Sequence, residues 1–329
     1  MKYLKLLLVC GFFLWSNAWA QTDCSPSNPE DTKVVDRGPV KTVTGPLANF
    51  DPCHKSVRLE TPSFFAKKRG DKPPLVLIAH GGGGLGGYER EFAKLMNQQG
   101  FATLIFDAFE MNGLVPQSDL LLYYMSNGGR QRMIYKATLG AYRWALKSDK
   151  VDTSKIFIQG LSNGAAVAIN MAAAVDGANV RGVIAEGGPS AGIGFPDDIK
   201  VPLLLIYGLA DNYGGVQQDD LMHLRAMPCS YNDNYQLAPA GFTQTCSRMS
   251  NPTNPMPSPQ IWYERIKAKG QEIRLELVDG GGHGMMFADF VSSSRQLGGG
   301  RWFYRSHGAS ADTRQKLQKL TIDFIESKL

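Results

Sequence analysis

The stretch that decides the fold is Lys155-Ile156-Phe157-Ile158-Gln159-Gly160-Leu161-Ser162-Asn163-Gly164, which continues as an alanine-rich run to residue 175. Residues 155–159 are a short apolar run typical of a buried strand, and residues 163–175 carry apolar side chains at helical spacings. Gly160 and Gly164 allow a sharp turn between them, because a residue without Cβ tolerates strained backbone and close approach. The stretch therefore predicts a strand, a sharp turn and a helix, with Ser162 at the turn.

The same alternation of strand and helix occurs along most of the chain. Apolar runs that are continuous, as in strands buried on both faces, lie at residues 75–79, 101–106, 155–159, 180–185, 202–207 and 273–278. Apolar residues at helical spacing lie at residues 88–99, 133–146, 163–175 and 313–327. This pattern predicts an α/β fold with a mostly parallel sheet and helices on both faces.

The first 20 residues have the features of an export signal. Lys2 and Lys5 accompany an apolar run at residues 6–14, and Ala18-Trp19-Ala20 supplies the small residues of a cleavage site. We therefore expect a signal peptide over residues 1–20 and a mature protein that is periplasmic or extracellular. Stable membrane insertion is not expected, since no later stretch approaches the ~20 apolar residues of a membrane-spanning helix.

The composition excludes disordered and fibrous proteins. The chain has 329 residues, of which 43% are hydrophobic, so it can bury a large core. It contains 35 basic and 30 acidic residues, and without Lys2 and Lys5 the balance is 33 to 30, a net charge of +3. So small an excess gives no reason to expect a nucleic-acid partner.

Four cysteines follow the predicted signal, namely Cys24, Cys53, Cys229 and Cys246. An even number of cysteines in an exported chain predicts disulfides. Three connectivities are open, and the pairing favoured by closeness in sequence joins Cys24 to Cys53 and Cys229 to Cys246. The first pair would close a polar, proline-rich N-terminal arm over residues 21–54.

A single α/β domain is expected over residues 55–329, with one interruption. Residues 212–259 contain both C-terminal cysteines and many Asn, Pro and Ser residues, with little strand or helix pattern. A loop of this length is usually functional. We interpret it as a cap-like insertion over the carboxyl edge of the sheet, with a variable surface excursion as the alternative.

The pentapeptide at residues 160–164 matches G-x-S-x-G, in which a nucleophilic serine stands on a sharp turn between a strand and a helix. A second match surrounds Ser190, but the glycines and the proline that follow it do not start a regular helix. We therefore favour Ser162 as a nucleophile and interpret Ser190 as a loop residue.

A serine hydroxyl needs a neighbouring base to become a nucleophile, and that base needs a carboxylate to orient it. Among five histidines, His283 lies in a glycine-rich loop directly after the last apolar strand. Asp211 follows the strand at residues 202–207 and is the favoured acid, whereas Glu186, after the preceding strand, is the rival. Asp107 is interpreted as a turn or ion-pair residue.

A glycine run, His80-Gly81-Gly82-Gly83-Gly84, follows the first predicted strand. Such a run can turn backbone N–H groups toward one point. Gly82 and Gly83, together with the N–H of Asn163, are the candidate oxyanion hole. A dinucleotide phosphate loop is the competing interpretation, because Asp107 closes the next strand about twenty residues further on, although no G-K-[ST] follows.

Four motifs in this order, H-G-G-G-G, G-L-S-N-G, G-L-A-D and G-G-G-H-G, resemble those of the α/β-hydrolase superfamily. Their spacing is similar to that of its dienelactone hydrolase-like branch. Over residues 55–329 the resemblance implies an eight-stranded, mostly parallel sheet and hydrolysis of esters or related acyl compounds through an acyl-enzyme. Serine stands where dienelactone hydrolase itself has cysteine, so that enzyme's own substrate is not expected.

The sequence therefore predicts an exported, carboxylesterase-like serine hydrolase with a triad of Ser162, Asp211 and His283. The expected partner is a small-molecule or polymeric ester. The alternatives are a secreted peptidase of the same fold, a polyester depolymerase and a non-catalytic binding protein on a hydrolase scaffold. No metal or cofactor is expected, because no H-E-x-x-H motif occurs and the cysteines are better used in disulfides.

Overall fold

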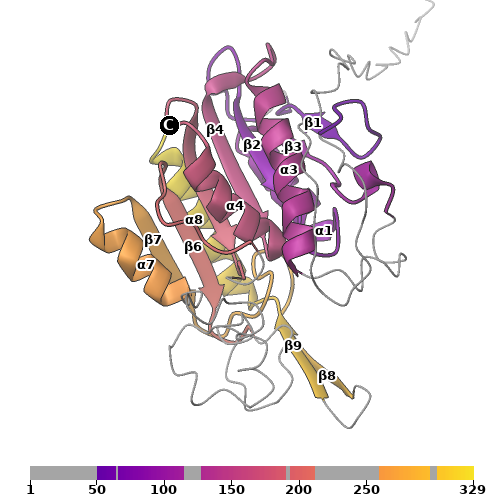
Figure 1. The fold of residues 1–329 in the computed structure, drawn as a ribbon, viewed down its shortest axis with the longest axis vertical. Helices are drawn as coiled ribbons and strands as arrows, with labels where there is room; N and C mark the ends of the chain where they lie inside the picture. The colour runs from indigo at the N-terminus through magenta and orange to yellow at the C-terminus, as the bar shows by residue number, and fades with distance from the viewer. Residues whose placement is uncertain (1–49, 64–65, 115–126, 190–192, 212–258, 297–301) are drawn as a thin grey trace, which may run out of the picture.

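The computed structural model describes residues 50–63, 66–114, 127–189, 193–211, 259–296 and 302–329. Its centre is a seven-stranded sheet in the order β1-β3-β2-β4-β5-β6-β7 (Figure 1). The strands are β1 (Arg58–Glu60), β2 (Pro74–Ala79), β3 (Ala102–Ile105), β4 (Asp152–Leu161), β5 (Val180–Glu186), β6 (Leu203–Gly208) and β7 (Ile273–Val278). β1 runs antiparallel to β3, and the other neighbouring pairs are parallel.

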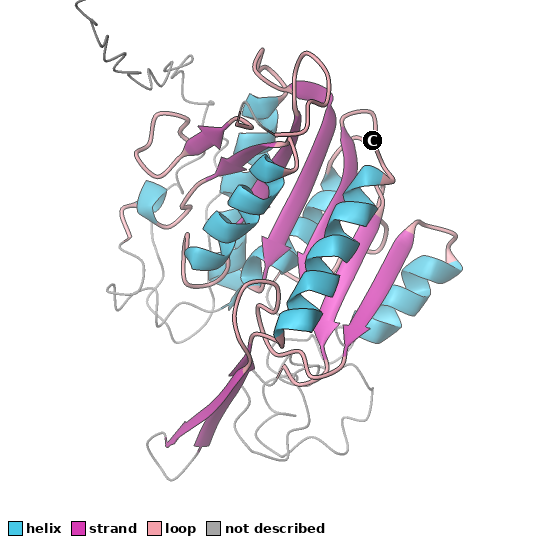
Figure 2. Ribbon diagram, turned by 180° about the vertical axis from the view of Figure 1, so that it is seen from behind, coloured by secondary structure: helices cyan, strands magenta, loops and turns pink. Residues whose placement is uncertain are grey.

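Helices cover both faces of this sheet (Figures 1 and 2). One face carries α3 (Asn127–Ala145), α4 (Asn163–Ala174) and α7 (Pro259–Ala268), and the other carries α1 (Gly87–Gln98) and α8 (Ala311–Glu326). A short 3-10 helix, η1 (Glu110–Asn112), follows β3. Among the helices of the described ranges, none combines the length and the apolar composition that crossing a bilayer requires.

Strand β2 shows why the strand runs are continuously apolar. Leu75, Leu77 and Ala79 belong to the core on the α3 and α4 side, whereas Val76 and Ile78 belong to the core on the α1 and α8 side. All five side chains are fully buried. Because successive side chains of a strand point to opposite faces, a strand between two helical layers has no solvent-facing position.

The six predicted strands and four predicted helices are all present, so the prediction of a mostly parallel α/β fold is confirmed. The strand number differs, because the described residues supply seven strands to the main sheet rather than eight. Two further strands, β8 (Val291–Gln296) and β9 (Trp302–His307), pair with each other in an antiparallel hairpin (Figure 1). β8 reads Val-Ser-Ser-Ser-Arg-Gln, which is too polar for a strand buried between two helical layers.

Several predictions fall on parts of the chain outside the described residues. These parts are the signal peptide over residues 1–20, residues 21–49 of the arm, Ser190, and the insertion up to residue 258. Within the described residues Cys53 is disulfide-bonded. Cys24, Cys229 and Cys246 lie outside them, so the pairing stays a prediction.

Candidate active site

The carboxyl ends of neighbouring parallel strands bring the predicted site residues to one edge of the sheet. Ser162 follows β4, Asp211 lies three residues after β6, and His283 lies in the loop after β7. Only β5 separates β4 from β6, and β6 pairs directly with β7. Ligand sites of open α/β sheets form at this edge, outside the carboxyl ends of the strands.

Ser162 stands on a strained turn between β4 and α4. Its φ is 57° and its ψ is −122°, and among the described residues it is the one non-glycine residue with positive φ. A Cβ on Gly160 would lie 2.1 Å from the carbonyl oxygen of Gly164, and one on Gly164 would lie 2.2 Å from that of Ala79. Both glycines are therefore required, and the turn projects the serine at the end of the strand.

His283 and Asp211 form a direct pair. The Nδ1 atom of His283 lies 2.7 Å from the Oδ2 atom of Asp211, and their side chains are 10% and 3% exposed. An ionised carboxylate only accepts, so Nδ1 carries the hydrogen and donates it. Burial by itself lowers the pKa of His283, but the charge and hydrogen bond of Asp211, joined by the charge of Glu186, outweigh burial and raise it above the ordinary value.

Backbone hydrogen bonds lock the two loops of this pair together. The N–H of Ala210 donates to the carbonyl of Gly281 at 2.8 Å. On the other side of the histidine loop, the N–H of His283 donates to Ser306 and the carbonyl of His283 accepts from Gly308, both at 2.9 Å. The imidazole is thus carried by a segment bound on two sides, which limits the ways in which it can be displaced.

The loops that carry Ser162 and His283 also pack against each other. A Cβ on Gly284 would lie 3.6 Å from the side chain of Leu161, which precedes the serine. A Cβ on Gly187 would lie 3.2 Å from the ring of His283. The serine, the histidine and the acid therefore share one small region at the end of β4, β5 and β6.

The glycine run lies along the same region. A Cβ on Gly81 would lie 3.7 Å from the Cβ of Ser162, and one on Gly82 would lie 2.5 Å from the side-chain nitrogen of Asn163. The N–H of Gly81 donates to Glu89 Oε1 on α1 at 3.0 Å, so this amide is already paired within the protein. The next backbone amides in the glycine run are those of Gly82 and Gly83. No atom lies within 4 Å of the position that a Cβ on Gly83 would take.

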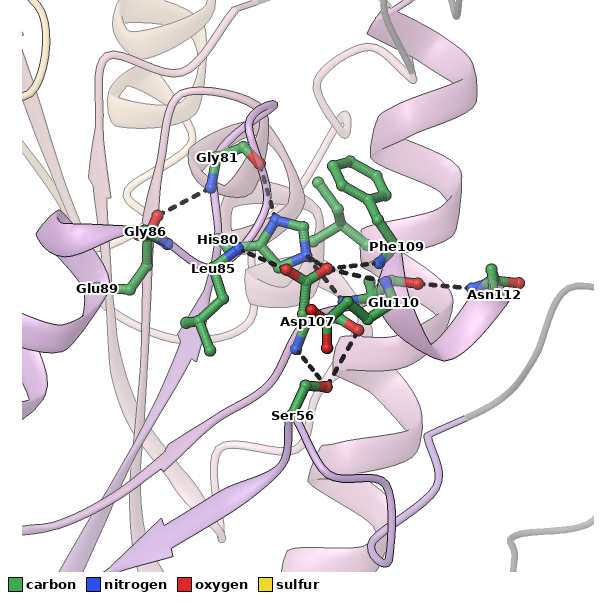
Figure 3. A network of polar contacts seen from close by, with 12 residues as sticks. Ser56, His80, Gly81, Leu85, Gly86, Glu89, Asp107, Phe109, Glu110 and Asn112 are labelled. Carbon is green, nitrogen blue, oxygen red and sulfur yellow. Dashed lines mark hydrogen bonds and ion pairs between the residues drawn. The ribbon is translucent and has the colours of Figure 1, made fainter. Parts of the chain in front are cut away.

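His80 is a structural residue (Figure 3). It is fully buried, its Nδ1 lies 2.7 Å from the carbonyl oxygen of Gly81, and its Nε2 lies 2.9 Å from the backbone nitrogen of Ala108. A carbonyl only accepts and an amide N–H only donates, so the ring is the neutral tautomer with hydrogen on Nδ1. Both nitrogens of His80 are thus occupied by the backbone.

Asp107 organises the adjoining turn (Figure 3). Its Oδ1 accepts from the N–H groups of Phe109 and Glu110 at 2.9 and 3.1 Å, and its Oδ2 accepts from Leu85 at 2.8 Å. The interpretation of Asp107 as a turn residue is confirmed. Since both oxygens already bind backbone N–H groups, this carboxylate is not presented to a ribose, which argues against the dinucleotide site.

Glu186 occupies a different position from Asp211. It is fully buried, and its carboxylate accepts hydrogen bonds from the O–H of Tyr88 and the N–H of Met285. Burial raises the pKa of Glu186, although both hydrogen bonds oppose the rise. Of the two candidate acids, it is therefore Asp211 that bonds to His283 through Nδ1.

Sequence reasoning missed two residues that support this site, Gln131 and Tyr88. Gln131 is fully buried and joins the start of α3 to the serine turn, because its amide donates to Asn163 Oδ1 at 2.9 Å and accepts from Ile193 at 2.8 Å. Tyr88 is the other, as the partner of Glu186. Neither belongs to a motif, and a polar residue within a helical pattern carries no sign that it will be buried.

Within the described ranges no three His, Cys, Asp or Glu side chains gather closely enough to hold a metal ion.

A comparison with models of known protein families identifies the family of this chain. The model of the dienelactone hydrolase family matches residues 62–238, which is more than half of the sequence. The chain belongs to the dienelactone hydrolase family. This makes it a hydrolase, as the order of its motifs predicted. In a comparison with curated proteins, none matches the chain.

Solved structures share the fold at low sequence identity. A protein of Klebsiella pneumoniae assigned to the dienelactone hydrolases is 11% identical, with a TM-score of 0.50 over 83% of this chain and 99% of that one. An acylaminoacyl peptidase bound to a chloromethyl ketone is 18% identical, with a TM-score of 0.51 over 82% of this chain and 38% of that one. The acylaminoacyl peptidase of Pyrococcus horikoshii is 17% identical, with a TM-score of 0.50 over 82% and 39%. At these identities the likeness shows the fold alone.

Proposed function

We propose that this member of the dienelactone hydrolase family is an exported serine hydrolase that cleaves carboxylic esters through an acyl-enzyme. The observation that carries the proposal is the 2.7 Å hydrogen bond between His283 and Asp211, at the sheet edge where Ser162 occupies a strained turn. An imidazole that is paired with a carboxylate, at the same sheet edge as a serine on such a turn, is suited to activate a hydroxyl. Export rests on the signal-like residues 1–20.

In the proposed mechanism, Nε2 of His283 takes the proton of Ser162 as its Oγ attacks the ester carbonyl. Asp211 stabilises the imidazolium that forms. The backbone N–H groups of Gly82, Gly83 and Asn163 donate to the oxyanion, and each such donor typically contributes ~3 kcal/mol to the transition state.

The intermediate then collapses to an acyl-enzyme. His283 gives its proton to the departing alcohol oxygen, so that the C–O bond breaks without releasing an alkoxide. A water molecule next loses a proton to His283 and attacks the acyl carbon. Collapse of this second intermediate releases the carboxylic acid and restores the hydroxyl of Ser162.

Labelling of the mature protein with a fluorophosphonate probe, followed by peptide mass spectrometry, tests the nucleophile. We expect an adduct on Ser162 that disappears in Ser162→Ala and persists in Ser190→Ala. No adduct on native, disulfide-intact protein would contradict the serine-hydrolase proposal and favour the binding-protein alternative.

Ester preference needs a second measurement. We expect p-nitrophenyl acetate or butyrate to be cleaved with a far higher kcat/KM than the corresponding p-nitroanilide. Comparable rates on the anilide and on short peptides would assign the peptidase alternative instead. Sedimentation with an insoluble polyester, with release of soluble acid, would identify the depolymerase variant.

A further inference from the structure

Glu186 touches the loops of the proposed triad at more than one point. Its backbone carbonyl accepts from the N–H of Ser162 at 2.9 Å. Its carboxylate accepts from the N–H of Met285, two residues after His283. The next residue along the chain, Gly187, lies against both the ring of His283 and the carboxylate of Asp211. This one residue at the end of β5 therefore links the serine turn to the histidine loop.

The donors around Glu186 are suited to an ionised carboxylate. The O–H of Tyr88 donates to Oε2, and the N–H of Met285 donates to Oε1. Burial, followed by the charge of Glu186, raises the pKa of Tyr88 well above its ordinary value, so the phenol keeps its proton and remains a donor. Gln159 in turn donates to the phenol oxygen at 3.4 Å. Both carboxylate oxygens are thus satisfied without a proton on Glu186.

We propose that Glu186 is a positioning residue for His283, a second carboxylate that holds the histidine loop through Met285 and adds negative charge beside the imidazole. The inference rests on the proposed function. Asp211 remains the residue that binds Nδ1, whereas Glu186 acts on the ring through the loop and through space.

The charges around Glu186 determine what its removal does. Tyr88 faces it from α1, with Glu89 beside Tyr88, and Asp211 and His283 face it from the loops after β6 and β7. The negative charge of Glu186 raises the pKa of His283. Neutralising Glu186 therefore lowers that pKa and extends the active form of the imidazole to lower pH.

The test is Glu186→Gln, which keeps the shape of the side chain and removes its charge. We expect kcat to fall by about tenfold or more with little change in KM, because a displaced base slows the chemical step. We also expect the acidic limb of the kcat/KM profile to move to lower pH, because the charge of Glu186 contributes to the raised pKa of His283. Glu264→Gln removes the same charge from an exposed position on α7, which carries none of the proposed site residues, and should leave both quantities unchanged.

Two results would overturn the proposal. One is a wild-type kcat in Glu186→Gln, and the other is a reduced kcat with an acidic limb that has not moved, which is what a purely structural role produces. If Glu186→Gln does not fold, Tyr88→Phe tests the positioning role, because it removes one donor and keeps the ring. In a folded Tyr88→Phe, a kcat within about twofold of wild type, or a lower kcat with an unmoved acidic limb, would then overturn it. A loss of about tenfold in kcat together with an acidic limb moved to lower pH supports it.

Fluorophosphonate labelling separates this inference from the proposed function. If wild-type protein fails to label on Ser162, the proposed function has failed. If wild-type protein labels and hydrolyses esters while Glu186→Gln behaves like Glu264→Gln, the role of Glu186 alone has failed.

Discussion

His283 bonds through Nδ1 to Asp211 at 2.7 Å, although the two residues are 72 positions apart in the chain. The bond exists because β6 and β7 are neighbours and their following loops are joined by the hydrogen bond from Ala210 to Gly281. The second carboxylate at this edge, Glu186, binds Tyr88 and Met285 instead. Because Asp211 and Glu186 have different partners, we expect their substitution to affect activity differently.

Asp211→Asn should lower kcat by about 10⁴-fold, because an amide of the same shape cannot hold the imidazole in the correct tautomer or stabilise the imidazolium. Ester hydrolysis by purified protein measures the effect, with circular dichroism to confirm folding. Glu186→Gln is the matched control and should lose far less activity. The reverse order of losses would assign the role of acid to Glu186.

The pH dependence of kcat/KM should reflect His283. A protonated imidazole cannot take a proton from Ser162, so activity falls as the pH drops through the pKa of His283. Since Asp211 and Glu186 raise that pKa despite burial, the midpoint of the acidic limb should lie above the ordinary histidine value of about 6.5. A midpoint well below 6.5 would contradict this assignment.

The strained turn at Ser162 predicts a stability difference between two inactive variants. Ser162→Gly and Ser162→Ala both lack the hydroxyl, but only glycine adopts a φ of 57° and a ψ of −122° without strain. Ser162→Gly should be more stable than Ser162→Ala by about 1 kcal/mol in chemical denaturation. Equal midpoints for the two variants would show that the turn stores no strain.

An ion cluster far from the site predicts a pH-dependent contribution to stability. Glu326, at the end of α8, accepts from Arg69 at 3.0 Å and from Lys67 at 3.2 Å. Arg69, joined by Lys67, lowers the pKa of Glu326 to about 2. The contribution is present above the unfolded-state pKa of about 4.5 and is lost as the pH falls through about 2.

Glu326→Gln should therefore reduce the free energy of unfolding by about 1 kcal/mol at pH 7, a value kept small because the carboxylate is partly exposed. Thermal unfolding at pH 7 and near pH 2 measures it, with Glu264→Gln as the control. A difference that persists undiminished at the lower pH would rule out the ion cluster as its source.

Most of the fold and the candidate nucleophile could be predicted from the sequence, because the deciding signals are local. Continuous apolar runs identify strands buried on both faces, as the alternation of Leu75 and Val76 between the two cores shows. The close approach of Gly160 to the carbonyl of Gly164 is a contact within five residues, whereas the approach of Gly164 to Ala79 on β2 depends on the tertiary structure. The three-residue β1, the hairpin of β8 and β9, and α7 lack such a continuous apolar run or a clear helical pattern, and they were not predicted.

Only the tertiary structure decided which polar residues meet. Asp211 and Glu186 both follow apolar strands, and nothing local distinguishes them, but strand order and loop packing bring one to Nδ1 of His283 and bury the other against Tyr88. His80 likewise stands at a strand end, and its role became visible only when both ring nitrogens were found on backbone atoms. Backbone conformation and burial pattern follow from neighbours along the chain, whereas hydrogen-bond partners tens of residues apart are set by how the elements pack.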